Sequence, residues 1–106
     1  MPKFLIEASL TSQGVKGVQG EGGTARQEAV SKAVESVGGR LESFYLGFGD
    51  HDVFVIADFP DNESAAAMAL AVNSSGAVAT RTVVLLTPEE VDSAAKRSVE
   101  YRPPGA

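Results

Sequence analysis

Hydrophobic and polar residues alternate through residues 3–11, which predicts a β-strand with one apolar face, formed by Phe4, Ile6, Ala8 and Leu10. Three further segments are rich in aromatic and β-branched residues and predict three more strands: residues 40–48, 52–59 and 77–86. Only Gly49-Asp50-His51 separates the second strand from the third. These two strands must be antiparallel, because a parallel pair needs a long crossover.

Apolar residues at helical spacing predict three helices, in residues 24–37, 61–73 and 87–98. The third helix has the strongest start signal, because Thr87-Pro88-Glu89-Glu90 supplies a cap, a proline at the first helical position and a glutamate at the third. Thr24 with Gln27 predicts a similar capping box for the first helix, and Asp61 predicts the cap of the second.

The glycine-rich segment between the first strand and the first helix, residues 12–23, predicts a flexible connector. An anion site at the start of the helix is the alternative, although the segment lacks the Gly-Lys-Ser/Thr ending of a phosphate-binding loop. The last residues, 99–106, predict an irregular tail. We expect a single domain over residues 1–98 of this 106-residue chain.

The predicted order of elements is βαββαβ followed by a C-terminal helix. Two right-handed β-α-β crossovers then give a four-stranded antiparallel sheet that carries its helices on one face. The predicted fold class is therefore α+β, a ferredoxin-like βαββαβ sandwich with an extra C-terminal helix.

The predicted strands are apolar on both of their faces. In residues 52–59, Val53 and Val55 point to one face, whereas Phe54 and Ile56 point to the other. The second strand likewise sets Phe44, Leu46 and Phe48 opposite Leu41 and Tyr45. Because the helices cover one face only, we expect the open face to pack on a second copy, giving a homodimer or a larger homo-oligomer. The alternative is that scattered apolar side chains stay exposed.

Composition narrows the possible chemistry. The chain has no cysteine and a single histidine, which excludes disulfides, thiolate nucleophiles and metal sites built from several Cys or His ligands. We expect neither a metal nor a cofactor. A net charge of −5 argues against a nucleic acid partner, including RNA bound on a sheet of this topology. No signal peptide or membrane-spanning run is found, so we expect a cytoplasmic protein without membrane contact.

The most distinctive local sequence is Gly47-Phe48-Gly49-Asp50-His51-Asp52, at the turn between the second and third strands. It is not a dinucleotide-binding fingerprint, because its spacing differs and it leads into a strand. A carboxylate beside an imidazole can hold it in one tautomer for general acid/base catalysis. We therefore take His51 and Asp52 as candidate catalytic residues. The alternative is a tight hairpin whose histidine is only solvated.

Arg81 and Tyr45 are candidate ligand-binding residues. Arg81 interrupts the fourth strand between two threonines, so its guanidinium must reach a sheet edge, a carboxylate or a bound anion. A salt bridge is the alternative to a ligand there. Tyr45, on the strand that enters the hairpin, can offer a phenol to a pocket, although packing in the core would also explain it.

Motifs spread over residues 3–91 resemble the GYD domain family: Leu10-Thr11-x-Gln13-Gly14, Arg26, Gly38-Gly39, Tyr45-x-Gly47, Gly49-x-x-Asp52, Pro60-Asp61, Gly76-x-Val78-x-Thr80-x-Thr82 and Thr87-x-Glu89-Glu90. In this chain His51 stands where that family has a tyrosine in a Gly-x-Tyr-Asp turn. The resemblance implies a dimeric α/β-barrel-like assembly, in which two ferredoxin-like sheets face each other, and implies no particular activity. Thr11 and Asp50 complete the candidate ligand-binding set.

Two functions from different classes follow. The first is a small homo-oligomeric module that binds a small ligand or regulates a partner, which fits the few reactive side chains. The alternative is a cofactor-independent isomerase or oxygenase that acts on a small organic substrate in a cleft between sheet and helices. In that enzyme His51 would be the acid/base, assisted by Asp50, Asp52 or Tyr45, by analogy with other dimeric α/β-barrel proteins.

Overall fold

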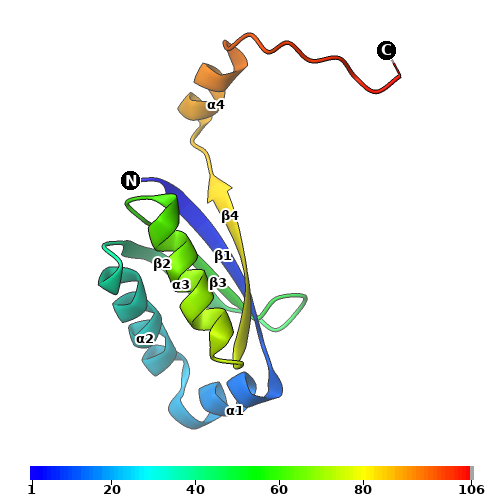
Figure 1. Ribbon diagram of the computed structural model, residues 1–106. Helices are drawn as coiled ribbons and strands as arrows, with labels where there is room; N and C mark the ends of the chain where they lie inside the picture. Colours follow the sequence, from blue (N-terminus) through cyan, green and yellow to red (C-terminus); the bar gives the residue numbers. More distant parts are fainter. Residues whose placement is uncertain (106) are drawn as a thin grey trace.

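The computed structural model describes residues 1–105 and contains eight regular elements: β1 (Lys3–Leu10), α1 (Ser12–Glu21), α2 (Gly23–Ser36), β2 (Arg40–Leu46), β3 (Val53–Asp58), α3 (Asn62–Ser74), β4 (Val78–Leu85) and α4 (Pro88–Ala95). The four strands form one sheet in the order β2-β3-β1-β4, and every neighbouring pair is antiparallel. Helices α2 and α3 lie on the same face of the sheet (Figure 1). The predicted α+β architecture with a four-stranded antiparallel sheet is confirmed.

The glycine-rich segment is a helix, α1, and the prediction of a flexible connector there was wrong. The side chain of Thr11 caps this helix by accepting a hydrogen bond from the backbone N–H of Gly14 at 3.3 Å. Gly14 is buried against the carbonyl oxygen of Ala77, which a Cβ at this position would overlap. Helix α1 therefore forms because of a contact with a segment more than sixty residues away.

The start of α2 also differs from the prediction. The helix begins at Gly23, and Gly22 occupies the cap position without a side-chain hydrogen bond. Gly22 has a φ of 89°, a left-handed backbone conformation that glycine adopts without strain. The predicted capping box of Thr24 and Gln27 is therefore wrong, because the sharp turn between α1 and α2 places Thr24 inside the helix.

The hydrophobic core lies between the sheet and the two long helices. Alternation along β1 buries Phe4, Ile6 and Ala8, as predicted, and the alternating residues of β3 lie opposite them. The edge of one ring meets the face of the other in the Phe4–Phe59 pair, with ring centroids 5.6 Å apart. The other buried members come from β3 and the helices: Val34, Val53, Val55, Ala57, Ala65 and Met68.

A bulge in β2 places one residue on the opposite face of the sheet from the one predicted. The pairing of β2 with β3 shifts between Leu41 and Ser43, so Leu41 pairs with Ala57 and Phe44 pairs with Val55. Because Ala57 and Val55 both face the helices, Leu41 packs on the core beside Phe44. The prediction that Leu41 lies opposite Phe44 was therefore wrong, since an extra residue in one strand reverses the alternation beyond it.

The open face of the sheet carries an apolar patch. Leu5 of β1 pairs with Ile56 on one side and with Val83 on the other, and Phe54 follows on β3. None of these four side chains is fully buried in the single chain. The two-sided apolar pattern predicted from the strands is therefore present, and we name Leu5, Phe54, Ile56 and Val83 the open-face patch.

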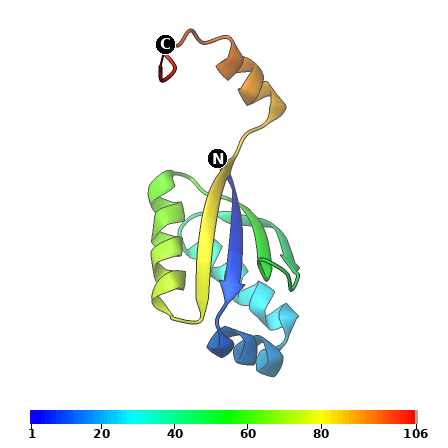
Figure 2. The same ribbon diagram turned by 90° about the vertical axis from the view of Figure 1, so that its right-hand side faces the viewer.

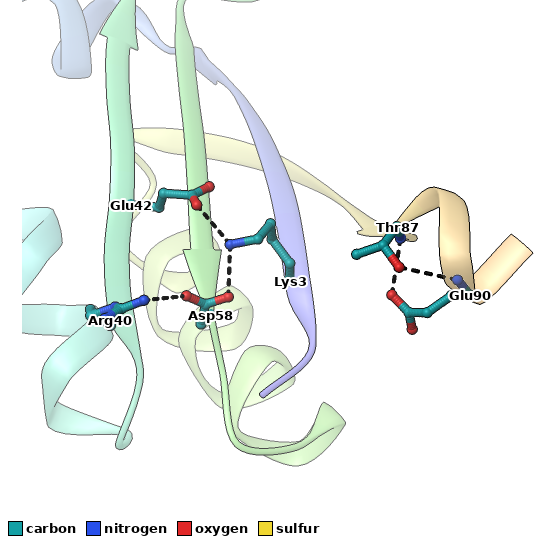
Figure 3. Close-up of polar contacts among 6 residues, drawn as sticks. All are labelled: Lys3, Arg40, Glu42, Asp58, Thr87 and Glu90. Atoms are coloured by element: carbon teal, nitrogen blue, oxygen red, sulfur yellow. Dashed lines mark hydrogen bonds and ion pairs between the residues drawn. The ribbon is translucent and has the colours of Figure 1, made fainter.

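The chain beyond β4 leaves the body of the molecule. Figures 1 and 2 show α4 and the residues after it extending past the end of the sheet. The predicted capping box at Thr87 and Glu90 is present (Figure 3). The helix ends at Ala95 rather than at residue 98. Residues 99–105 contain no helix or strand, as predicted, and Ala106 lies outside the described residues.

Candidate functional site

The only histidine of the chain makes two polar contacts across the open face of the sheet. Its Nε2 atom lies 3.2 Å from a carboxylate oxygen of Glu7, and its Nδ1 atom lies 3.3 Å from the hydroxyl of Ser9. The side chains of His51 and Glu7 are 28% and 21% exposed. The edge of one ring meets the face of the other in the His51–Phe54 pair, at a centroid distance of 6.4 Å.

These contacts follow from the strand pattern and the hairpin. Glu7 and Ser9 alternate with the buried Ile6 and Ala8, so they point to the open face of β1. The hairpin between β2 and β3 then returns the chain beside the end of β1. His51 therefore lies on the face opposite the helices, whereas the enzyme alternative required it to reach a cleft between sheet and helices.

The two aspartates beside His51 do not contact its ring. Asp52 accepts a hydrogen bond from the backbone N–H of Leu10 at 2.8 Å, and its own N–H donates to the carbonyl of Ala8 at 2.8 Å. Asp52 therefore fastens the hairpin to β1. Asp50 is exposed and, within residues 1–105, has no hydrogen bond or ion pair from its side chain. The carboxylate beside the imidazole is Glu7, which sequence reasoning missed.

Two of the remaining predicted ligand residues, Tyr45 and Arg81, lie in one cross-strand row with Phe54 and Glu7 on the open face, whereas Thr11 lies at the end of β1. Tyr45 is exposed on the edge strand β2, where it pairs with Phe54. Arg81 is exposed on the edge strand β4, paired with Glu7, and makes no ion pair among the described residues. The hydroxyl of Thr11 donates to the carbonyl of Gly76 at 3.0 Å while it caps α1. Thr11 is thus occupied in joining β1 to the turn before β4.

The structure also contains a cavity of about 90 Å³ between the sheet, α2 and α3. Most of its lining is apolar, including Met68 and Val72 of α3. Its polar members are Arg26 of α2 and two threonines of β4, Thr80 and Thr82. The guanidinium of Arg26 lies 3.3 Å from the carboxylate of Glu21.

The enzyme alternative predicted a cleft between sheet and helices, but sequence reasoning placed none of these polar residues in it, although a signal was present. Thr80 and Thr82 occupy positions of β4 that face the helices, where an apolar core would require apolar residues. Arg26 lies one turn before the apolar stripe of α2. Together these three residues form the polar part of the otherwise apolar lining of the cavity.

A group of charged side chains lies at the end of the sheet away from the hairpin (Figure 3). The carboxylate of Asp58 accepts from Lys3 at 3.0 Å and from Arg40 at 3.4 Å, and Lys3 also donates to Glu42 at 2.9 Å. Lys3, with a smaller effect from Arg40, holds the pKa of the Asp58 carboxyl below its ordinary value of 3.8. Glu42 and Asp58 raise the pKa of Lys3 above 10.5. Every member has a partner, so this group stabilises the sheet and offers no free charge to a ligand.

The described residues 1–105 contain no group of three His, Asp or Glu side chains placed to hold a metal ion. They also contain no helix with the length and apolar character to cross a bilayer.

Comparison with protein families matches residues 4–95 to the GYD domain. That match covers both the sheet with its helices and the capped helix α4. No curated protein matches the sequence.

Proposed function

The chain belongs to the GYD domain family, and from that premise we propose that it is a small homo-oligomeric module that binds a small organic ligand in the cavity between α2, α3 and the sheet. The cavity is the observation that carries this proposal. Most small-molecule sites are concave and apolar, with a few polar groups that orient the ligand. Here the apolar residues of the sheet and both helices supply the walls, and the polar groups are few.

The lining favours a ligand with an apolar body and a negatively charged or hydrogen-bonding head. A space of about 90 Å³ accommodates an apolar group of a few heavy atoms. Arg26 is 34% exposed, so its guanidinium lies where the cavity meets solvent and can bind a carboxylate. Glu21 neutralises that guanidinium in the free chain, and an anionic ligand would compete with Glu21 for it.

The homo-oligomer is proposed to form through the open face. The strand order β2-β3-β1-β4 supports a ferredoxin-like sandwich, whose open face carries the open-face patch. Packing of two such faces would bury the patch and give a dimeric α/β-barrel-like assembly. We also propose a cytoplasmic location, which the absence of cysteine supports.

The two methionines allow a direct test of ligand binding. Met68 lines the cavity, whereas Met1 is exposed at the N-terminus. With methyl-labelled methionine, we expect butyrate or isobutyrate, whose apolar groups match the size of the cavity, to shift the Met68 methyl resonance in a saturable manner and to leave Met1 unchanged. Shifts of equal size at both methyl groups, or none at Met68 with either probe, would contradict the proposal.

A matched pair of substitutions on α3 makes this test specific. Ala69 lines the cavity, and Ala66 on the same helix is exposed outside it. Ala69→Leu fills part of the cavity, so we expect it to weaken probe binding at least about tenfold. Ala66→Leu leaves the cavity unchanged and should bind the probe as the original chain does.

A second candidate function is acid/base catalysis at His51, as in a cofactor-independent isomerase or oxygenase. It is favoured by the Glu7–His51–Ser9 arrangement, in which a carboxylate holds one imidazole nitrogen and leaves the other to exchange a proton. Because His51 lies on the open face, its substrate would bind there, beneath a second copy. Loss of turnover in His51→Gln, with ligand binding in the cavity retained, would support this candidate over the first.

A further inference from the structure

Residues 86–105 form an extension, here named the C-terminal arm, in which every residue is exposed. The arm includes α4 and large apolar side chains: Leu86, Val91, Val99 and Tyr101. None of its residues is buried, and none belongs to the hydrophobic core of the chain. The body of the chain therefore completes its core without the arm.

Helix α4 is nevertheless defined by specific interactions. The hydroxyl of Thr87 accepts from the N–H of Glu90 at 3.1 Å, and the Glu90 carboxylate accepts from the N–H of Thr87 at 3.0 Å. An isolated helix of eight residues is marginal in water even with a good cap. Val91, Ala94 and Ala95 lie on adjacent positions of the helix and form a small apolar side. A helix of this kind is stable when its apolar side packs on a partner.

The chain exposes more surface than a compact monomer of its mass, and the excess is large enough to form a protein interface. A folded monomer of 11.0 kDa exposes roughly 5,600 Å², whereas this chain exposes 7233 Å². The excess is roughly 1,600 Å², twice what one partner buries in a standard protein interface. The radius of gyration is 16.7 Å, compared with about 13 Å for a compact chain of this length.

The position and charge of the arm indicate the kind of partner. Figure 2 shows α3 on one side of β4 and α4 displaced to the other side, beyond the end of the sheet. Residues 96–105 contain three basic residues and one acidic residue, a net charge of +2, and residues 86–95 contribute −3. The body, residues 1–85, contains six basic and ten acidic residues, a net charge of −4. The end of the arm is thus complementary in charge to the body of another copy.

We propose that the C-terminal arm packs on a second copy of this chain, reciprocally about a twofold axis. The apolar side of α4 lies against the open-face side of the second copy, and Lys96, Arg97 and Arg102 lie near its acidic residues. A twofold interface repeats each contact, so both arms are covered at once. This inference rests on the proposed homo-oligomer and adds the arm to its interface.

The test compares two substitutions that each place a charge at an exposed aliphatic position. Val91 on α4 and Leu70 on α3 are both exposed, so a charge at either position leaves the core of the chain intact. In sedimentation velocity over a concentration series, we expect Val91→Asp to raise the dimer dissociation constant at least about tenfold, because it buries an unpaired charge. Leu70→Asp should change that constant less than twofold.

Two results would overturn the inference, and they are distinguishable. If the original chain is a monomer at all concentrations, both the homo-oligomer and the role of the arm are wrong. If the original chain and Val91→Asp dimerise equally, the proposed packing of the arm on the second copy is wrong, and the homo-oligomer is unaffected. Amide exchange gives a second readout: α4 should be protected above the dissociation constant and should lose protection on dilution, whereas the core strands keep theirs.

Discussion

A carboxylate oxygen of Glu7 lies 3.2 Å from Nε2 of His51, so a residue near the start of the chain supplies the partner of the only histidine. The hydroxyl of Ser9 lies on the other ring nitrogen. A carboxylate can only accept, so the neutral ring is expected to carry its hydrogen on Nε2 and to accept from Ser9 at Nδ1. The Glu7–His51 contact thereby selects one tautomer.

This selection can be measured without interference from other histidines. In ¹⁵N spectra recorded where the imidazole is neutral, we expect the Nε2–H tautomer to predominate. Glu7→Ala removes the acceptor and should give a mixture of the two tautomers. Asp52→Asn serves as the control, because its side chain does not contact the ring, and an equal effect of both changes would argue against the Glu7 contact.

Two glycines of α1 should respond in opposite directions to the same substitution. A Cβ on Gly14 would overlap the carbonyl of Ala77, so Gly14→Ala should lower the free energy of unfolding by about 2–4 kcal/mol. Gly17 has open space around its Cα, so Gly17→Ala should raise it by about 0.5–1 kcal/mol through helix propensity. Urea unfolding of both variants measures the difference. Equal effects would show that α1 does not dock against Ala77.

The ion pairs of Asp58 should make stability depend on pH in the acid range. Lys3 and Arg40 lower the pKa of Asp58 from 3.8, so the folded state favours its ionised form. The stabilisation is complete above that value and disappears as the pH falls through the lowered pKa. Asp58→Asn should reduce the free energy of unfolding by about 1–2 kcal/mol at neutral pH.

The pH profile distinguishes this effect from a general loss of packing. The difference between the original chain and Asp58→Asn should shrink in urea titrations below pH 3.8. Asp50→Asn is the matched control, because Asp50 is exposed and has no partner among residues 1–105. A difference that stays constant down to pH 2 would contradict an electrostatic origin.

Neighbouring valines of β4 test the proposed use of the open face. Val83 points to the open face and Val84 to the helix side, and both are exposed in the single chain. Val83→Lys should weaken the homo-oligomer at least about tenfold, because it places a charge in the apolar interface. Val84→Lys should leave it unchanged. Light scattering over a concentration series measures both, and dissociation by Val84→Lys alone would place the interface on the other face.

The features that could be predicted from sequence have determinants close together in the chain. Thr87 and Glu90 cap each other across one helical turn, so the start of α4 was predictable. Alternation in β1 and β3 depends on neighbouring residues, and it placed Phe4, Ile6 and Val55 in the core correctly. The short turn near residue 50 required an antiparallel pair, which the structure confirms.

The features that were missed depend on contacts between distant segments. Helix α1 forms in a glycine-rich sequence because Gly14 fits against Ala77. The carboxylate near His51 is Glu7, which is brought there by the pairing of β1 with β3. The cavity arises from the separation of α2 and α3 across the sheet, which no local pattern specifies. The partner of His51 and the face of the sheet on which it lies therefore could not be predicted without the fold.

The contact of Thr11 with the turn before β4 also has a consequence for the order in which the chain folds. The hydroxyl that caps α1 donates to carbonyls of Gly76 and Ala77, which are the last residues to be synthesised before β4. Until β4 pairs with β1, neither this contact nor the docking of Gly14 on Ala77 exists, and a ten-residue helix with three glycines has little stability of its own. Helix α1 is thus expected to be among the last elements to form and, on unfolding, to open together with the β1–β4 edge of the sheet.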